Sequence, residues 1–518
     1  MSWRSGWKWA GLLAGVAALW LSYGRDGAPY ITNDGYQYLD AASNLAAGRC
    51  LCTRVVLFDE QIAFGDFPVP FTHFAPGYSL LIAGISRVGL TPEIAGYLIS
   101  AAGFLVSIWL LQDVAVALGA SACVAAAFSL IWITSATALL YGSAVETESL
   151  FTAVLLTLVA LVVRDIRSRG ANRLLPIGIG VVAGLAYWIR YPGLFLLGGA
   201  GLYLITTAWR VPRERSGAIA GLVTAVLLAA AVQIRNAVYM GSWRGGFKSG
   251  SSQTLHEVAT GTVRAFLHLV TGDRVPVRFG IGLAFLLLCS GLALFLGIRA
   301  WRPGDSAGIG WALFIGIAYV GGVMVAALTT IAADLPRYYF PVYPLLLACA
   351  AAFCSSFASG KKSLVVALLV FSVVAVEARN LFVPPPAPDW IVTKAILAQE
   401  VQPGVPLLEW LQQRLGSDGT LAAVEGQAVH YVLQSPVVAM IPAGATSRRG
   451  DGPAFQSLMR QFHAQYLLLL PGVPSDRIPE QSSYEFLRQV AAGDAPTWLE
   501  PAARTRDAVV YKCVGCTN

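Results

Sequence analysis

Charged side chains lie at the ends of several apolar segments of this sequence, where such groups are costly and often functional. Asp34 follows the first apolar segment, in ITNDGYQYLD, and Glu146 lies between two later ones, in YGSAVETES. Carboxylates in these positions can take up a proton as a general base or bind a divalent cation. Asp34 and Glu146 are therefore candidate site residues, including as metal ligands.

Three arginines and one histidine have a comparable placement. Arg190 ends an apolar segment in WIRYPG, Arg235 does so in QIRNAVYM, and Arg337 begins one in LPRYYFP. His73 precedes a short apolar segment in THFAPGYS. A guanidinium is permanently charged and binds phosphate with two hydrogen bonds. Carboxylates and arginines together at a membrane interface suit a lipid-linked phosphate substrate, with a water-soluble partner supplying the nucleophile.

Each of these residues also has a purely structural interpretation. Asp34 is also placed to cap the helix that its segment predicts, and Glu146 or Glu148 to cap the helix that follows them. The arginines suit contacts with lipid headgroups through their long side chains, and His73 suits a structural position. Asp59, Glu60 and Asp66 fit a solvated loop face.

The composition indicates that these residues belong to a membrane protein. Of the 518 residues, 56% are hydrophobic and only 13% are charged, against about 25% charged in soluble proteins. Apolar runs of about 20 residues are long enough to cross a bilayer. The net charge of +7 does not indicate nucleic-acid binding, because the basic residues form short clusters between apolar runs.

The apolar runs predict a mainly α protein, a transmembrane bundle of about eleven helices. Residues 3–23 resemble a signal peptide but lack a clean cleavage site, so we interpret them as a retained first helix. Arg and Lys clusters in alternate loops place the N-terminus in the cytoplasm. Residues 76–90 predict a short helix at the outer surface. The expected spans are 7–23, 93–112, 120–139, 148–163, 175–189, 192–208, 217–236, 279–298, 309–330, 338–357 and 363–382.

Two domains are expected. Residues 1–383 form the membrane domain, with a first outer loop at 24–75, and PPPAP at 384–388 is a stiff spacer. Residues 384–518 predict a small extracytoplasmic α/β domain, because helical patterns alternate with strand patterns. The expected helices lie at 405–416 and 453–464, and the expected strands are in TLAAVEG, YLLLL and DAVVYKC.

Eight cysteines divide between the two environments. Cys123, Cys289, Cys349 and Cys354 lie in apolar segments and suit ordinary packing. Cys50, Cys52, Cys513 and Cys516 lie in predicted outer segments, where disulfides persist. The sequence does not give their pairing, and zinc binding by the two close pairs is an alternative.

The order of short motifs resembles the C-type glycosyltransferase superfamily, and within it the bacterial protein O-mannosyltransferase and aminoarabinose transferase group. The resemblance covers roughly residues 1–385 and depends on several weak motifs in the right order. These motifs are NDGYQYLDAASNLAAG, HFAPGYSLLIAG, SAVETESLFTAVLL, RYPGLFLL, RNAVYMGSW and LPRYYFPVYPLLLA.

The resemblance implies transfer of a sugar from a polyprenyl-phosphate carrier to an acceptor at the outer membrane face, with inversion at the anomeric carbon. Asp34 would be the general base and Glu146 would assist it, with a divalent cation as an option. Arg190, Arg235, Arg337 and His73 would hold the donor phosphate. The sequence departs from many relatives in having Asp34-Gly35 where they have Asp-Glu, and in a long insert at 49–72. Asp40 is the alternative second acid.

The expected location is the inner or plasma membrane. The sugar stays open, and the acceptor is a glycolipid, a polysaccharide or a protein; no nucleic acid is expected. Two other classes of function remain. One is a transporter or flippase of lipid-linked sugars, which broken helices and paired repeats would favour. The other is a non-catalytic scaffold or receptor, which would not need Asp34 and Glu146 together.

Overall fold

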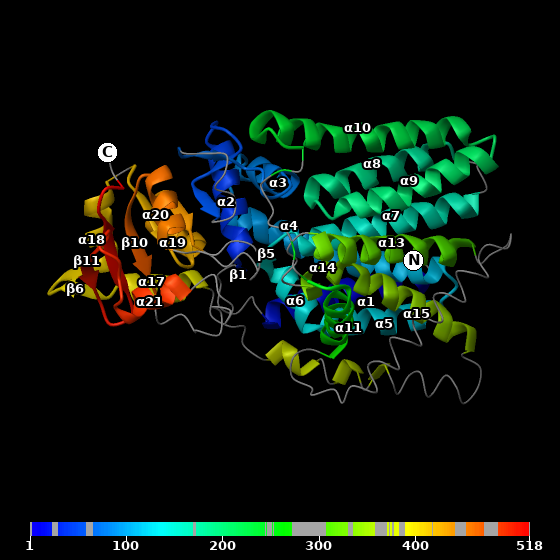
Figure 1. The fold of residues 1–518 in the computed structure, drawn as a ribbon. Helices are drawn as coiled ribbons and strands as arrows, with labels where there is room; N and C mark the ends of the chain where they lie inside the picture. The colour runs from blue at the N-terminus through cyan, green and yellow to red at the C-terminus, as the bar shows by residue number, and fades with distance from the viewer. Residues whose placement is uncertain are drawn as a thin grey trace.

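The structure is a computed structural model, and it describes most of the chain. The described residues are 3–22, 30–57, 66–168, 172–243, 245, 251, 253–271, 307–329, 335–357, 370–371, 373–375, 378–382, 389–416, 418–440, 452–470 and 485–516. A helical bundle makes up one part of the molecule, and an α/β unit lies at one end of it (Figure 1).

Most expected apolar segments are helices. The bundle region contains α1 (Trp3–Ser22), α2 (Asn33–Ala46), α3 (Gly77–Ser86), α4 (Pro92–Ala117), α5 (Ala122–Thr134), α6 (Ala136–Ser143), α7 (Glu148–Ser168), α8 (Leu174–Ile189), α9 (Gly193–Arg210), α10 (Arg215–Met240), α11 (Leu255–Thr271), α13 (Ala307–Thr329), α14 (Leu335–Tyr339) and α15 (Tyr343–Phe357). Short 3-10 turns lie at Phe340–Val342 and Arg379–Phe382. The surface segment expected at 76–90 contains the short apolar helix α3.

Five described helical segments are long and apolar enough to cross a membrane, or six if the bent pair α5–α6 is one span. The span expected at 279–298 lies outside the described residues, and so does half of the one expected at 363–382. The total of about eleven spans therefore stays a prediction.

Two expected spans are interrupted helices: both are still apolar enough to cross a membrane, but each contains a break that was not expected. The segment expected at 120–139 ends at Ser135, whose extended backbone separates α5 from α6, and the two helices bend by 67°. The segment expected at 338–357 starts earlier and contains a 3-10 turn at Phe340–Val342. Pro341 in this turn lacks the N–H that a regular helix requires. Apolar composition continues through both breaks and so conceals them.

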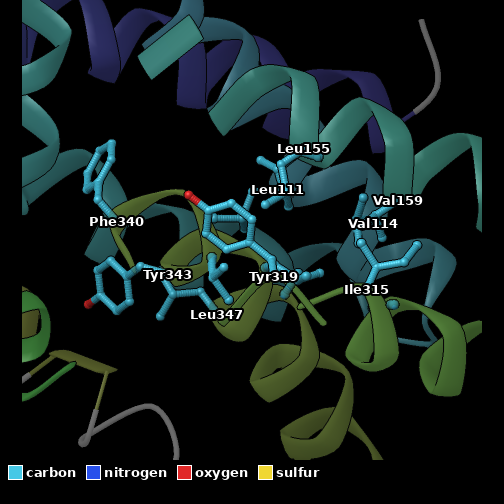
Figure 2. Packing of buried hydrophobic residues seen from close by; sticks show 14 of the residues in the cluster. Leu111, Val114, Leu155, Val159, Ile315, Tyr319, Phe340, Tyr343 and Leu347 are labelled. Atoms are coloured by element: carbon cyan, nitrogen blue, oxygen red, sulfur yellow. The ribbon is translucent and has the colours of Figure 1, made fainter. Parts of the chain in front are cut away.

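The bundle packs around a continuous apolar core. Figure 2 shows Leu111 of α4, Leu155 of α7, Tyr319 of α13 and Leu347 of α15 in this core, and all four are buried. Close approach of helices depends on glycine. A Cβ at Gly180 of α8 would lie 1.9 Å from the carbonyl oxygen of Gly221 of α10, so only hydrogen fits there.

The α/β unit contains a six-stranded mixed sheet in the order β11-β12-β10-β8-β9-β3. Strands β10, β8, β9 and β3 are parallel to one another. At one edge of the sheet β12 pairs antiparallel with β10, and β11 pairs antiparallel with β12. The strands are β3 (Val55–Leu57), β8 (Thr420–Ala423), β9 (Val437–Ala439), β10 (Ala464–Leu469), β11 (Leu499–Arg504) and β12 (Val509–Cys513). The helices are α17 (Asp389–Leu397), α18 (Leu407–Leu415), α19 (Gly426–Leu433), α20 (Gly452–Gln461) and α21 (Glu485–Ala492). The small pair β6 (Glu400–Gln402) and β7 (Val405–Pro406) precedes α18.

Helices cover both faces of this sheet. Residues of α17, α18 and α19 pack in one apolar cluster, and residues of α20 and α21 pack in another. Strands lie at the three segments where the sequence predicts them, and α18 and α20 match the two expected helices. The boundary at residue 384 lies outside the described residues.

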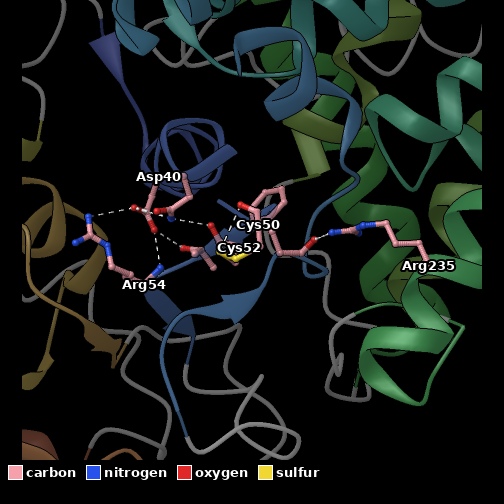
Figure 3. Close-up of a disulfide and its surroundings, with 8 residues drawn as sticks. Asp40, Cys50, Cys52, Arg54 and Arg235 are labelled. Atoms are coloured by element: carbon pink, nitrogen blue, oxygen red, sulfur yellow. Dashed lines mark hydrogen bonds and ion pairs between the residues drawn. A yellow bond between two sulfur atoms is a disulfide. The ribbon is translucent and has the colours of Figure 1, made fainter. Parts of the chain in front are cut away.

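The first outer loop contributes to the same sheet. Its strand β3 pairs with β9, so Val55 lies opposite Val437. The loop also forms the pair β2 (Cys52–Thr53) and β4 (Val69–Pro70). A disulfide joins Cys50 to Cys52 beside β2 (Figure 3). The insert at 49–72 therefore attaches the membrane domain to the α/β unit, a role that the division into two domains does not anticipate.

Candidate functional site

Two short parallel strands bring the candidate acids together. Strand β1 (Tyr30–Ile31) pairs in parallel with β5 (Ala144–Val145), and Ile31 lies opposite Val145. Because parallel strands end at the same edge, the residues that follow them meet. Thr32, the N-cap of α2, follows β1, and its hydroxyl donates to the carboxylate of Glu146, which follows β5. Asp34 lies in the first turn of α2.

Arg337 holds three carboxylates at this point. Its Nη1 lies 2.6 Å from Oδ2 of Asp34, and its Nη2 lies 2.7 Å from Oε2 of Glu146. Its Nε donates to Oε1 of Glu148. All donating faces of the planar guanidinium thus point at acids, an arrangement that a lysine cannot reproduce.

Arg190 is the second cation of the cluster. Its Nη1 donates to Oε1 of Glu148 at 2.6 Å, and both side chains are buried. Its guanidinium also lies over the ring of Tyr338, 5.3 Å from the centroid, which favours a cation. Neither Arg190 nor Arg337 is a free side chain directed at headgroups.

Burial separates the roles of the three acids. The side chain of Asp34 is 23% exposed, whereas that of Glu146 is 1% and that of Glu148 is 0% exposed. Burial, together with the charges of Glu148 and Asp34, raises the pKa of Glu146 well above its ordinary value, against the opposing effect of Arg337.

Arg235 lies in a second cluster, around residues 71–74. Its Nη2 donates to the carbonyl oxygen of Phe71 (Figure 3). Tyr191, the neighbour of Arg190, donates its hydroxyl to the carbonyl oxygen of Thr72 at 2.7 Å and accepts from Asn236. Within this loop His73 packs against the ring of Phe74. The half-buried Arg235 and His73 are therefore held near each other by one short loop.

The structure thus divides the six predicted site residues into two groups. Asp34, Glu146, Arg190 and Arg337 form one cluster, and Arg235 and His73 belong to the other. Arg190 and Tyr191 connect the two, because consecutive residues contact one cluster each.

The structure also bears on two alternative roles of these residues, helix capping by Asp34 and metal binding by Asp34 and Glu146. The N-cap of α2 is Thr32, which accepts from the backbone N–H of Gly35, so Asp34 is not the cap. A cation does lie between Asp34 and Glu146, but it is the guanidinium of Arg337. Within the described ranges no group of three His, Cys, Asp or Glu side chains has the arrangement of a metal site.

Asp40 is not a second acid of this site. It accepts from the backbone N–H of Arg54 at 2.6 Å and from the hydroxyl of Thr53 at 3.0 Å. Its Oδ1 lies 3.3 Å from Nε2 of His430 in α19. Burial opposes its charge, but the hydrogen bonds of His430 and Arg54 outweigh it and lower the pKa of Asp40. Asp40 connects the first loop to the α/β unit.

Glu148 and Thr32 have a larger part in the site than the sequence indicates. Glu148 contacts both arginines, although its position at the start of α7 favours a capping role. The spacing of Glu146 and Glu148 by two residues was the available signal. The contact of Thr32 depends on the pairing of β1 with β5, which two-residue strands do not reveal in a sequence.

The cysteines in the outer segments form two disulfides, Cys50–Cys52 and Cys513–Cys516. These bonds replace the alternative of zinc binding by the same pairs. Cys123, Cys349 and Cys354 are not part of a disulfide, and Cys289 lies outside the described residues.

Solved structures identify the fold. Neither a protein-family model nor a curated protein matches the sequence. The structure of ArnT from Cupriavidus metallidurans bound to undecaprenyl phosphate matches with a TM-score of 0.55 at 15% identity, covering 100% of this chain and 99% of that one. Its apo state matches with the same TM-score at 16% identity, covering all of both chains.

A third match is the oligosaccharyltransferase from Archaeoglobus fulgidus in complex with zinc and sulfate. Its TM-score is 0.51 at 12% identity, and the match covers 89% of this chain and 67% of that one. Together with the apolar helices, these matches show a multi-pass membrane protein. The chain has the fold of the C-type membrane glycosyltransferases, as the order of its motifs predicts.

Proposed function

We propose that this protein transfers a sugar from a polyprenyl-phosphate carrier to an acceptor hydroxyl at the outer face of the membrane. The observation that carries the proposal is the contact of Asp34 with Arg337, which fixes the most exposed of three clustered carboxylates at the start of α2. The shared fold supports it, because one protein with this fold was solved with undecaprenyl phosphate bound.

The proposed reaction is a single displacement with inversion. Asp34 takes the proton of the acceptor hydroxyl, and the acceptor oxygen forms a bond to the anomeric carbon of the sugar. The bond from that carbon to the phosphate oxygen breaks, and the carrier leaves as polyprenyl phosphate. Phosphate is a good leaving group, so the remaining needs are a base, neutralisation of charge and orientation.

Arg235 and His73 are the proposed phosphate contacts. Arg235 is half-buried near the end of α10, whose surface carries the exposed side chains Ile234, Val238 and Tyr239. An apolar helix surface next to a guanidinium suits a carrier with an apolar tail and a phosphate head. The loop at residues 71–74 holds His73 beside the same position.

The buried members of the first cluster hold the base. We assign Glu146, Glu148, Arg190 and Arg337 to positioning Asp34, because their side chains bond to one another and are largely buried. The positive charge next to Asp34 and Glu146 comes from Arg337.

The proposed location is the inner or plasma membrane, with the N-terminus in the cytoplasm and the α/β unit outside. The lipid-linked donor enters from the bilayer, and the acceptor enters from the water side. The C-terminal residues 384–518 and the first loop at 24–75 are the proposed outer parts.

A transporter of lipid-linked sugars is the second candidate, favoured by the 67° bend between α5 and α6. The test of both uses the purified protein in liposomes with a panel of undecaprenyl-phosphate sugars. Sugar transferred to an added acceptor supports the enzyme. Carrier moved between leaflets without any transfer, across the donor panel, supports the transporter and contradicts our proposal.

A further inference from the structure

The carboxyl ends of parallel strands are where open α/β sheets bind ligands, in particular where successive connections leave in opposite directions. Strand β8 lies between β10 and β9. From β8 the chain passes through α19 to β9 on one side. From β9 it passes back over β8 to β10 on the other side, and this second connection contains α20. The helices α19 and α20 pack in different apolar clusters, on opposite faces of the sheet. This point of the sheet lies at the end of β8, and the side chain found there is Glu425.

Glu425 has an unusual backbone. It is the N-cap of α19 and has φ 55° and ψ 37°, a left-handed conformation, whereas N-caps normally have an extended backbone. This conformation is unfavourable for a residue that has a Cβ. Such outliers concentrate at functional sites. Gln434 has a similar φ of 62°, but it is the C-cap of α19, where the left-handed conformation is common.

This strained residue lies next to the proposed base. Oε2 of Glu425 is 3.5 Å from Nδ2 of Asn33, and Asn33 directly precedes Asp34 in α2. The contact of α2 with the α/β unit is fixed on either side. Tyr36 accepts from the backbone N–H of Trp390 at 3.0 Å, and Asp40 faces His430.

The same interface contains buried polar atoms whose hydrogen bonding is incomplete. Among the described residues, Oδ1 of Asn33, Oε1 of Gln427 and both amide atoms of Gln37 have no hydrogen-bond partner. Gln37 is 0% and Gln427 is 2% exposed. Gln37 lies four residues after Asn33, on the same face of α2. Buried polar groups normally find partners, so a polar ligand at this interface would complete them.

We propose that Glu425, Asn33 and Gln427 bind the hydroxyl groups of a carbohydrate acceptor and present one of them to Asp34. This inference rests on the proposed function and names its acceptor class. The carboxylate of Glu425 and the amide oxygens of Asn33 and Gln427 are all hydrogen-bond acceptors. A sugar ring donates from several adjacent hydroxyls, whereas a serine or threonine side chain donates from one.

The test uses the full-length protein in nanodiscs, with an undecaprenyl-phosphate sugar as donor and free disaccharides or Ser/Thr peptides as acceptors. Glu425→Gln removes the charge, and Glu425→Gly removes the carboxylate while favouring the observed φ. Both variants are expected to raise the KM for the disaccharide about tenfold or more and to leave the KM for the donor within about twofold. Glu500→Gln, on the exposed edge strand β11, is the matched control.

An unchanged disaccharide KM in both Glu425 variants overturns the proposal, and so does transfer to peptides alone. Hydrogen–deuterium exchange separates this result from failure of the proposed function. The disaccharide alone is expected to protect residues 30–46 and 425–434 in the wild type and not in Glu425→Gln, even if no transfer is found. No protection in the wild type overturns the acceptor site.

Discussion

Arg337 and Asp34 are 303 residues apart in the sequence, yet Nη1 of the arginine lies 2.6 Å from Oδ2 of the aspartate. The same guanidinium also bonds to Glu146 and Glu148. Four segments, namely the start of α2, the residue after β5, the start of α7 and the short helix α14, therefore form one charged cluster. An acid held by such fixed partners keeps its orientation before the substrate arrives, which favours catalysis.

Glu146 and Glu148 are expected to respond differently to the loss of a carboxylate. Burial raises the pKa of Glu146 and so disfavours its charged form. Glu146→Gln is therefore expected to keep more of the transfer activity than Glu148→Gln does. Glu148→Gln removes the negative charge that pairs with both arginines and is expected to destabilise the protein by about 3 kcal/mol.

Thermal melting in detergent and the rate of transfer measure this difference for the two variants side by side. Equal losses in both variants would contradict the expected difference between Glu146 and Glu148.

Arg235 is expected to act on the donor alone. Arg235→Ala removes the proposed phosphate contact and is expected to raise the donor KM about tenfold, or about 1.4 kcal/mol, with the acceptor KM unchanged. Arg235→Lys keeps the charge but loses the paired hydrogen bonds, so an intermediate KM is expected. The exposed Arg213, just before the other end of α10, supplies the control Arg213→Ala. A donor KM equal to that of the wild type would remove Arg235 from the phosphate site.

Asp40 gives a dependence of stability on pH. Its pKa is lowered in the folded protein, so its contribution is complete above its unfolded pKa of about 3.9 and is lost as the pH falls through the folded value. Asp40→Asn is expected to lower the melting temperature at pH 7, and the gap to the wild type is expected to narrow below about pH 4. A gap that stays constant between pH 7 and pH 3 would contradict the assigned charge of Asp40.

Two glycine-to-alanine variants test how closely the helices of the bundle pack. Gly180→Ala puts a Cβ into the backbone of Gly221 and is expected to separate α8 from α10 and destabilise the bundle. Gly198→Ala, in α9, meets nothing within 4 Å and is expected to be neutral or slightly stabilising, by up to about 1 kcal/mol. Melting temperatures of both variants in the same detergent give the comparison. Equal melting temperatures would contradict the packing of α8 on α10.

The sequence predicts local features of this structure better than it predicts contacts between residues that are far apart in the chain. Apolar run lengths predict the helices α4, α7 and α10, because burial in lipid demands a continuous apolar surface. The break at Ser135 was missed, because its neighbours are equally apolar. Asp34 and Arg337 were recognised separately, since charge at a helix end is visible locally. Their contact was not, because it depends on the path of the chain between two residues that are 303 positions apart.

The first loop shows the same limit. Its insert at 49–72 reads as an isolated loop with a cysteine pair, whereas β3 completes the edge of a sheet whose other strands lie beyond residue 419. A three-residue strand carries too little pattern to name its partner.

The most direct test of the central claim measures sugar transfer from radiolabelled undecaprenyl-phosphate sugars by wild type, Asp34→Asn and the control Asp66→Asn, at matched protein levels. Asn keeps the shape of Asp34 and loses its basicity. The account predicts about a hundredfold slower transfer in Asp34→Asn, the size expected for losing a general base, and unchanged transfer in Asp66→Asn, whose side chain is exposed. Transfer by Asp34→Asn at the wild-type rate would contradict the account.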